Sequence, residues 1–388
     1  MRIAQVSPLY ESVPPKCYGG TERVVSYLTE ELVCLGHEVT LFASGDSVTK
    51  AHLRSPCQRA LRLDKGCVDQ LSHHILMLEQ IFRDADQFDI IHFHIDYLHY
   101  LLSRRHRMCH ITTLHGRLDI PDLVGLYNEF SEMPLISISD AQRRPLHWAN
   151  WRGTVYHGLP LDLYRSHEQC GTYLAFLGRI SPEKRVDRAV EIAKRSGIPL
   201  KIAAKVDKVD LEYYKAKIEP LLDHPLIEYV GEIGEGEKGE FLGNAYALLF
   251  PIDWPEPFGL VVIEAMACGT PVIAFRHGSV PELIEVGVTG FVVDCLDEAV
   301  MAVEKVPGLN RKRCREVFEQ RFSASRMATD YVKAYLSQRA LSDGISRKAR
   351  KPVLGIVKAQ AEVHAEADSV VEIGVPAKEG IRFGSDKV

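Results

Sequence analysis

The apolar residues in the first half of the chain follow two alternating patterns. The segment 21–35 carries Val24, Leu28 and Leu32 at the spacing of one helix face, and Gly36 follows as a stop signal. Short apolar runs between such segments predict strands, at residues 3–7, 38–43, 90–93, 111–114 and 135–138. This alternation predicts a mostly parallel sheet covered by helices.

The second half of the chain starts the same pattern again. Its apolar runs and helical segments predict strands at 173–177, 200–204, 227–230, 247–250 and 272–275, and helices at 186–194, 211–222 and 259–267. A polar segment that contains Pro160 separates the two series and predicts a linker over 158–171. We therefore predict an α/β protein with two Rossmann-like, doubly wound domains.

The predicted domains cover residues 1–160 and 161–323. A helix is expected at 324–336, packing back on the first domain. Residues 337–388 have weak periodicity, and we expect this tail to be partly disordered. The length of 388 residues also suits two cores better than one.

Composition and charge narrow the classes of protein. A hydrophobic fraction of 46% with 26% charged residues is globular, and a net charge of −5 gives no support to nucleic-acid binding. The N-terminus has no apolar leader, and the apolar stretch 260–275 is broken by Glu264 and Pro271. The nine cysteines form no C-x-x-C pair, so we expect a cytoplasmic protein. The basic cluster at 347–351 is more typical of a solvated surface than of a membrane contact. Peripheral contact with a membrane stays open as the alternative.

The segment 255–265 carries the most specific chemistry. A predicted strand leads into a proline-rich loop, and Gly259 begins a helix, whose free N–H groups and positive dipole end suit a phosphate. Glu256 precedes this helix and Glu264 interrupts its apolar run, so that each acid is placed to accept hydrogen bonds from hydroxyl groups. The alternative for either acid alone is a solvated helix carboxylate, but a buried Glu264 would need a partner.

Two further segments join a strand to a helix through glycine. Arg179 follows Gly178 at a predicted strand end, where open α/β sheets bind ligands, and Lys184 stands at the next helix start, where a bound diphosphate would offset its unfavourable position. The alternative is a surface ion pair with Glu183 or Asp187. The pair Gly19 and Gly20 is a weaker signal, because an ordinary turn has the same pattern.

Together these segments resemble the retaining glycosyltransferases of family 4, which have the GT-B fold. The resemblance covers about residues 1–336. Glu256 and Glu264 are similar to the family's Glu-x7-Glu signature, and Arg179 with Lys184 to its phosphate-binding pair. The loop after Ala204 departs from the family pattern, which often has glycines there.

The resemblance implies a role for each position. It assigns catalytic roles to Arg179, Lys184, His115 and Glu256, of which the two cations hold the diphosphate in place of a metal. It assigns acceptor-side contacts to Glu22, Arg117 and Arg143. It assigns donor-binding contacts to Gly19, Gly20, Gly178, Ile233, Phe258, Gly259, Leu260 and Glu264.

The predicted function is transfer of a hexose-type sugar from a UDP-, GDP- or ADP-sugar to a sugar, lipid or small-molecule acceptor, with no cofactor and no metal. Asp84 and Asp86 form an Asp-x-Asp pair but lack the rest of the glycosyltransferase fold in which such a pair binds a metal. His92 and His94 share a strand face, where a zinc site is an alternative but core or cleft histidines are commoner. Cys268 is expected to be a packed thiol.

Several alternatives stay open at this point. A sugar-nucleotide epimerase or another GT-B enzyme would share the diphosphate grip, and a non-catalytic protein would bind the nucleotide sugar without transferring it. A dinucleotide oxidoreductase is disfavoured, because the G-x-G-x-x-G fingerprint is missing. The sequence leaves the base, the sugar, the acceptor and the oligomeric state undetermined.

Overall fold

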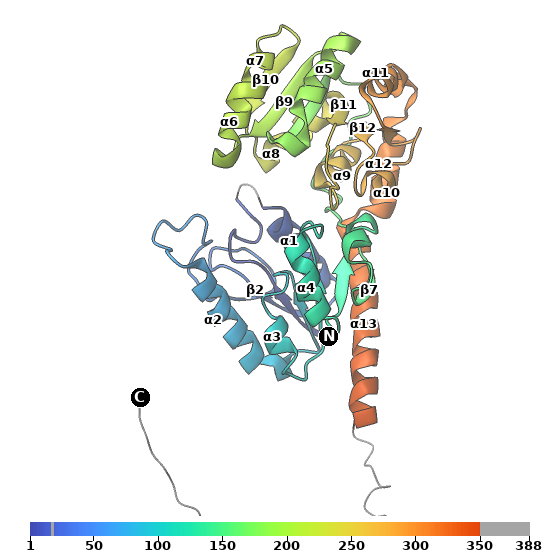
Figure 1. Cartoon of the computed structure of the whole chain (residues 1–388). Coiled ribbons are helices and arrows are strands. Elements are labelled where there is room, and N and C mark those ends of the chain that lie inside the picture. Colours follow the sequence, from blue (N-terminus) through green and yellow to red (C-terminus); the bar gives the residue numbers. More distant parts are fainter. Residues whose placement is uncertain (17–18, 350–388) are drawn as a thin grey trace, which may run out of the picture. The chain divides into compact units, whose positions relative to one another are not determined.

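In a computed structural model, residues 1–16 and 19–349 are described, with side chains up to residue 342. The chain divides into two units, Met1–Ala340 and Leu341–Val388. The first unit contains both sheets (Figure 1). The side chains of the basic cluster 347–351, and residues 350–388 of the predicted tail, lie outside the described residues.

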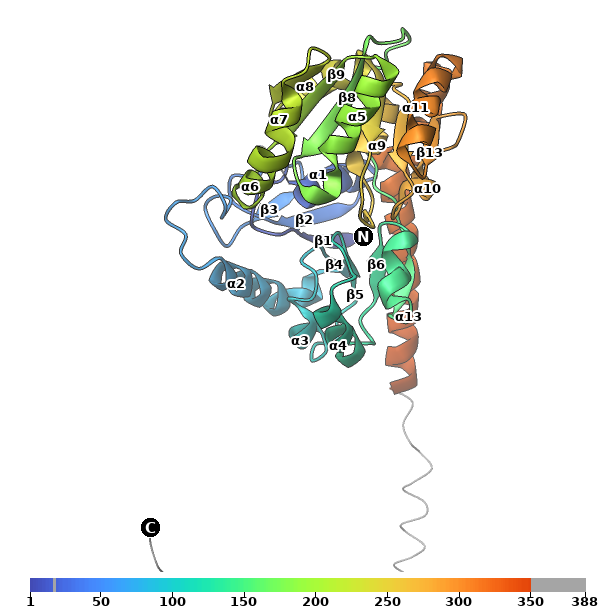
Figure 2. The same cartoon turned by 45° about the horizontal axis from the view of Figure 1, so that its top comes forward.

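The first sheet is formed by the N-terminal strands in the order β3-β2-β1-β4-β5-β6-β7, and every pairing in it is parallel. Figure 2 shows its strands side by side in blue to green. The strands are β1 (Arg2–Val6), β2 (Glu38–Phe42), β3 (His52–Arg54), β4 (Ile90–Phe93), β5 (His110–Thr113), β6 (Leu135–Ser137) and β7 (Trp151–Thr154). The connecting helices are α1 (Gly20–Cys34), α2 (Gln70–Arg83), η1 (Ala85–Gln87), α3 (Tyr100–Ser103), α4 (Pro121–Glu129) and η2 (Ala141–Leu146).

Alternating side chains of the first sheet face two separate cores. Ile3 packs with Val24 and Leu28 of α1, whereas its neighbour Ala4 packs with Met77 and the rest of the apolar face of α2. Because successive residues of a strand point to opposite faces, one run of apolar residues serves both layers. The continuous apolar runs of the sequence are therefore explained by burial on both sides.

The second sheet has the order β10-β9-β8-β11-β12-β13 and is also parallel throughout. Its strands are β8 (Tyr173–Arg179), β9 (Leu200–Lys205), β10 (Ile227–Gly231), β11 (Ala245–Phe250), β12 (Val272–Phe275) and β13 (Gly290–Val293). One face is covered by α5 (Val186–Ser196) and α11 (Leu296–Lys305), and the other by α8 (Glu235–Gly243), α9 (Leu260–Ala267) and α12 (Arg311–Arg321). The remaining elements are η3 (Pro182–Lys184), η4 (Lys208–Asp210), α6 (Leu211–Tyr213), η5 (Tyr214–Ile218), α7 (Glu219–Leu222), α10 (Val280–Leu283) and η6 (Val306–Gly308).

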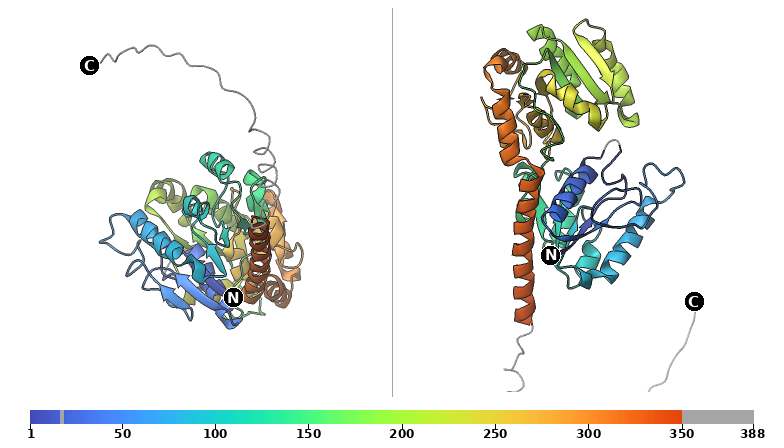
Figure 3. Two further views of the ribbon diagram at one scale, coloured as in Figure 1. Left: turned by 90° about the horizontal axis from the view of Figure 1, so that it is seen from below. Right: turned by 180° about the vertical axis from the view of Figure 1, so that it is seen from behind.

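The C-terminal helix α13 (Ala324–Ala349) contacts the first sheet's core. Met327, Ala328, Tyr331 and Tyr335 are fully buried there, next to Ile3. The views in Figure 3 show this helix in orange to red beside the N-terminal strands. Its length corrects one expectation, because residues 337–349 are helical where the sequence predicts the start of a partly disordered tail.

The helix predicted at 211–222 is interrupted. It is divided into α6, the π-helical turn η5 and α7, whose second residue is Pro220, a residue that removes a backbone donor. The domain boundaries at 160 and 323 stay predictions, although Leu159 and Ser323 pair in an isolated bridge where the chain leaves one sheet and later returns. Among the described residues, no helix combines the length and apolarity needed to cross a bilayer.

Candidate functional site

An ion pair joins two segments that the sequence singled out separately. Lys184, at the end of η3, contacts the carboxylate of Glu256, which lies in the loop after β11. The indole N–H of Trp254 donates to the same carboxylate at 3.0 Å, and the ammonium lies 5.1 Å from the centre of the indole ring. Both side chains are mostly buried, so this is a constrained pair and not the predicted alternative of a surface pair with Glu183 or Asp187.

The start of α9 lies directly after this loop. Gly259 has φ 88°, a conformation that favours glycine, and a Cβ there would stand 3.2 Å from the ring of Phe250. Leu260 is the first helical residue, and a Cβ on Gly20 would lie 3.7 Å from its side chain. The start of α1 and the start of α9 therefore lie next to each other, although α1 packs on the first sheet and α9 on the second.

Arg179 is the last residue of β8 and has an exposed fraction of 34% in its side chain. It pairs with Glu183 at 2.6 Å and lies 3.5 Å from both Asp207 and Asp210. For Arg179 the expected alternative of an ion pair with Glu183 is thus present. Gly178 precedes it on the same strand end, and Ile233 packs against the core on the α9 side of the sheet.

Glu264 is buried, and its partner is a residue that sequence reasoning did not identify. Lys238 of α8 lies 2.9 Å from the Glu264 carboxylate and 3.3 Å from Glu235. Glu235 also lies 2.5 Å from Arg23 of α1, and the hydroxyl of Tyr164 donates to it. The three-residue spacing of Glu235 and Lys238 is recognisable in the sequence as a helical ion pair. Their contacts with Glu264 and Arg23 join distant segments, which the spacing does not indicate.

Opposite charges compensate one another within this cluster. The neighbouring cations Lys238 and Arg23, together with the Tyr164 hydroxyl, hold the pKa of Glu235 below its usual value despite burial. The two carboxylates raise the pKa of Lys238 against the desolvation effect. Because Arg23 belongs to α1 and the others to the second sheet, the cluster connects the two sheets through buried charge.

His115 follows β5 and contacts other histidines. Its Nε2 lies 2.8 Å from His94 Nδ1, and its ring stacks on His157 at a centroid distance of 5.3 Å. The ring of His157 in turn lies 4.7 Å from Phe258, next to Gly259. Burial lowers the pKa of His115 to about 3, so the imidazole is neutral at physiological pH.

The three predicted acceptor-side residues lie in different surroundings. Glu22 of α1 is buried, and burial together with the nearby Glu11 raises its pKa. Arg117 is exposed, pairs with Asp119 at 2.7 Å and lies 5.9 Å from the Trp254 ring. Arg143 donates to Ser137 at 2.6 Å and to Thr154, so these contacts hold β6 and β7 together.

Neither of the discounted metal motifs forms a metal cluster in the described part of the chain. Asp84 caps α2 and pairs with Arg54 at 2.7 Å. His92 is fully buried and bonds to Tyr335 and Thr113. Cys268 is buried as expected, and burial raises the pKa of its thiol to about 12.

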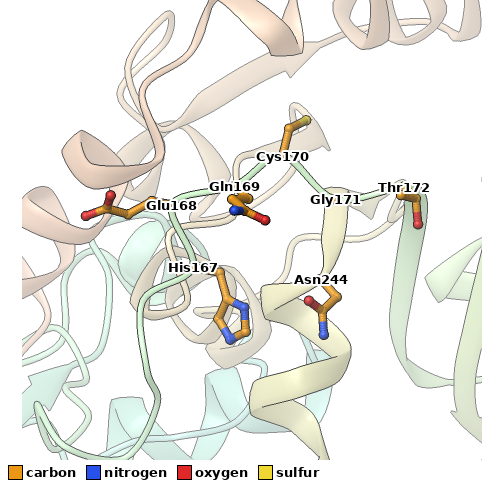
Figure 4. Close-up of a pocket in the computed structure, with 7 residues that line it drawn as sticks. All are labelled: His167, Glu168, Gln169, Cys170, Gly171, Thr172 and Asn244. Atoms are coloured by element: carbon orange, nitrogen blue, oxygen red, sulfur yellow. The ribbon is translucent and has the colours of Figure 1, made fainter.

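A pocket of about 500 Å³ includes His167, whose backbone N–H donates to the carbonyl of Cys268 at 3.0 Å. Figure 4 shows its lining, which comes from the linker segment His167–Thr172 and from Asn244 at the end of α8. Among the lining residues none was expected to bind a donor or an acceptor. The candidate site therefore does not coincide with this hollow.

Comparison with known proteins gives two family matches. The family model described as glycosyl transferases group 1 matches residues 167–315, and the model described as glycosyltransferase family 4 matches residues 18–157. The first match contains Arg179, Lys184, Glu256 and Glu264. The second contains Gly19, Gly20, Glu22 and His115.

Individual relatives agree with these matches. A D-inositol 3-phosphate glycosyltransferase of Mycobacterium sp. (strain JLS) is 30% identical over 46% of this chain and 42% of its own length. A phosphatidyl-myo-inositol mannosyltransferase of Mycobacterium leprae is 26% identical over 81% of this chain and 89% of its own length. For several curated relatives, the matched segments span only 31 to 46% of the relative.

Solved structures share the fold. A sucrose-phosphate synthase of Thermosynechococcus elongatus covers 88% of this chain and 100% of its own, with a TM-score of 0.71 and 18% identity. HepE of Anabaena, in complex with UDP and glucose, covers 87% and 100%, with a TM-score of 0.65 and 18% identity. The two parallel sheets and the two family matches agree, and the chain belongs to the family 4 glycosyltransferases of the GT-B fold.

Proposed function

We propose that this protein transfers a hexose-type sugar from a nucleoside-diphosphate sugar to an acceptor, with retention of the anomeric configuration and without a metal. The observation that carries the proposal is the contact between Lys184 and Glu256 beside the start of α9. It brings a cation, a carboxylate and free helix N–H groups to one place, which are the groups that a sugar diphosphate needs.

The cations of the second sheet would act on the leaving group. Departure of the nucleotide is the main barrier of such a transfer, because negative charge grows on the diphosphate. Arg179, Lys184 and the amides of Phe258, Gly259 and Leu260 are fixed donors for that charge, and prepositioned donors of this kind contribute most to transition-state stabilisation. In the proposal, Gly178, Gly19 and Gly20 allow the ligand to approach the backbone closely.

The carboxylates would hold the hydroxyl groups of the donor. Glu256 is assigned to the sugar and Glu264 to the ribose, with Ile233 next to the base. Burial of Glu264 supports this role, since a buried carboxylate needs either its present partner Lys238 or a bound donor group. The UDP in the Anabaena structure supports a nucleotide-sugar donor. The proposed donor is a UDP-, GDP- or ADP-sugar.

The acceptor is proposed to lie on the side of the first sheet, near Glu22, Arg117 and Arg143. The proposed acceptor is a sugar, a lipid or a small molecule. Cys34, Cys170 and Cys295 are exposed free thiols, which supports the expected reducing cytoplasm. Peripheral contact with a membrane belongs to the same proposal.

A thermal-shift screen tests the donor class. UDP, GDP and ADP, each alone and as its glucose or mannose derivative, are added at about 1 mM to the full chain. A ligand present at a hundred times its Kd should stabilise the fold by about 2.7 kcal/mol, so one base should raise the melting temperature by several degrees. If every nucleotide sugar leaves the melting temperature unchanged, the proposed function is rejected.

Variants of the two cations test the mechanism once a donor is known. Arg179→Ala and Lys184→Ala should each lower kcat by about a hundredfold or more, because each removes charge stabilisation from the leaving group. Arg195→Ala is the matched control, since Arg195 of α5 forms an exposed ion pair with Asp297 of α11. Near-normal turnover in both site variants would contradict the assigned roles.

A further inference from the structure

A chain of hydrogen bonds runs through the interior of the first unit to His115. The Gln5 amide Nε2 donates to the hydroxyl of Tyr335 at 2.9 Å, and the Gln5 Oε1 lies 2.9 Å from His94 Nε2. His94 Nδ1 then lies 2.8 Å from His115 Nε2. Gln5, His94 and Tyr335 are all at least 98% buried and come from β1, the end of β4 and α13. Direct contacts therefore connect these groups from end to end.

The orientation of the Gln5 amide determines which group donates and which accepts in each of these hydrogen bonds. Because Gln5 Nε2 is turned toward Tyr335, its Oε1 faces His94 and accepts a hydrogen bond from the Nε2–H of that histidine. Burial holds the pKa of His94 well below 6.5, so the ring is neutral and carries one proton. His94 Nδ1 is then an acceptor, and its partner must be the Nε2–H of His115.

This assignment leaves one nitrogen of His115 as a bare acceptor. His115 is neutral, and with its proton on Nε2 the lone pair is on Nδ1. That Nδ1 is buried and has no hydrogen-bond partner among the described residues. Because an unsatisfied buried acceptor destabilises the fold, it indicates a group that is satisfied when a ligand binds.

The position of His115 supports a ligand from the donor side. Its ring stacks on His157, and His157 contacts Phe258, whose amide is assigned to the donor in the proposed function. We propose that Gln5 and His94 are positioning residues that hold His115 as the Nε2–H tautomer, so that its Nδ1 accepts a hydrogen bond from a hydroxyl of the donor sugar. The ligand part of this inference rests on the proposed function, whereas the tautomer does not.

The lone pair on His115 Nδ1 should select among donor sugars. A sugar that presents a hydroxyl to His115 gains a hydrogen bond, whereas one that presents a carboxylate places negative charge against an acceptor. Neutral hexoses are therefore the expected donors, and uronic acids are expected to be rejected. The selectivity would come from His94 and Gln5 as much as from His115, because they set its tautomer.

Nitrogen NMR on the free protein tests the tautomer without any ligand. The full chain is labelled with ¹⁵N-histidine, and the signals of His115 are identified by their loss in His115→Asn. We expect an unprotonated, pyridine-like Nδ1 and a protonated, pyrrole-like Nε2. A pyrrole-like Nδ1 in the wild-type protein would overturn the inference, since His115 Nε2 would then accept a hydrogen bond from His94 instead of donating one.

Two variants test the positioning. Gln5→Met keeps the shape of the side chain but removes the acceptor for His94, so His115 should show a mixture of the two tautomers. Ser103→Ala is the control, because Ser103 of α3 bonds at 2.6 Å to the buried His99 at the start of that helix and makes none of the hydrogen bonds between Tyr335 and His115. If Gln5→Met does not fold, Tyr335→Phe replaces it, since it frees the Gln5 amide to turn. Unchanged His115 signals in a folded Gln5 or Tyr335 variant would contradict the positioning role.

Calorimetric titration with UDP-glucose and UDP-glucuronate tests the ligand part. The wild type should bind UDP-glucose at least about tenfold more tightly than UDP-glucuronate. This preference should shrink in Gln5→Met but not in Ser103→Ala. Equal affinities for the two in the wild type would overturn the assigned hydrogen bond. If no nucleotide sugar of any base binds, the proposed function fails, and the NMR result alone decides on the tautomer.

Discussion

Replacing Lys238 by methionine should destabilise the second sheet far more than the loss of an ordinary surface lysine. Lys238 pairs with the Glu264 carboxylate at 2.9 Å, and the two side chains are only 17% and 5% exposed. Glu235 keeps Arg23 at 2.5 Å when Lys238 is removed, so the charge left uncompensated is that of Glu264.

The size of the effect follows from the burial of Glu264. Removing one partner of a buried pair costs about 3–5 kcal/mol, and the partial exposure of Lys238 puts this case near the lower end, at about 3 kcal/mol. For a domain of this size, each kcal/mol lowers the melting temperature by about 2–4 °C, which gives a loss of about 6–12 °C. The methionine keeps much of the length of the lysine stem, so packing changes little.

The assay compares three variants by thermal and urea unfolding. Lys201→Met is the control, because Lys201 is half-exposed: its pair with Glu228 at 3.0 Å is worth about 0–1 kcal/mol, and its contact with the Tyr173 ring at 4.9 Å adds about 0.5–1 kcal/mol. The double variant Lys238→Met with Glu264→Leu should recover most of the stability, since it removes the unpaired charge as well. The buried-charge explanation is refuted if Lys238→Met unfolds within about 1 °C of Lys201→Met, or if the double variant is less stable than the single one.

Two further results are expected. Gly259→Ala should lower stability by about 1–2 kcal/mol and weaken nucleotide binding, because φ is 88° and the added carbon meets Phe250. Gly125→Ala, inside α4 with open space around it, should instead raise stability by up to about 1 kcal/mol; equal melting temperatures of the two variants would contradict this. Stability should also fall as the pH drops from 7 to 5, because burial lowers the pKa of several histidines below the unfolded value of about 6.5. Their stabilisation is complete above about pH 6.5 and is lost by on the order of 1 kcal/mol per histidine and pH unit below it, which urea midpoints at about pH 7, 6 and 5 would reveal; a constant midpoint would argue against it. These histidines include His92, His94, His99, His110, His115 and His157.

Most strands of the two sheets were predictable because burial on both faces leaves continuous apolar runs. β3, β7 and β13 were missed: β3 and β7 have no buried residue, and only the first and last residues of β13 are buried. α12 was missed for another reason: its sequence has few apolar residues, and Arg311 and Arg315 hold it by donating to the backbone carbonyls of Gly243, Ala245 and Ala267. Its buried apolar face is short, with Cys314, Val317 and Phe318, so the apolar periodicity is weak among the charged residues around it.

The C-terminal helix shows the same limit. Residues 337–349 continue α13 although their periodicity is weak, because Met327, Tyr331 and Tyr335 anchor the preceding turns in the first sheet's core. A helix that is already nucleated adds residues with little further cost. The anchoring contacts are with Ile3 and its neighbours, at the opposite end of the chain, and sequence spacing carries no information about them.

The candidate site was predictable in its motifs and not in its counter-ions. Glycine turns and paired acids follow local rules, so Glu256, Gly259 and Glu264 were identified. Lys184 was predicted as a phosphate ligand but not as the partner of Glu256, and Lys238 was not predicted, because both lysines reach the acids from other elements. Contacts of this kind depend on the strand order β8-β11, which brings η3 next to the loop after β11.

The pairing of Lys184 with Glu256 bears on how the proposed donor would bind. A diphosphate that takes Lys184 removes the cationic partner of Glu256, and the mostly buried carboxylate then keeps only the hydrogen bond from the Trp254 indole. The hydroxyl groups of an attached sugar supply new partners to that carboxylate, whereas a free nucleoside diphosphate does not. On the proposed function, the ion pair therefore couples the two halves of the donor, because occupying the cation is unfavourable unless the acid is occupied as well. Such coupling favours the intact sugar nucleotide over the product and helps the spent nucleotide to leave.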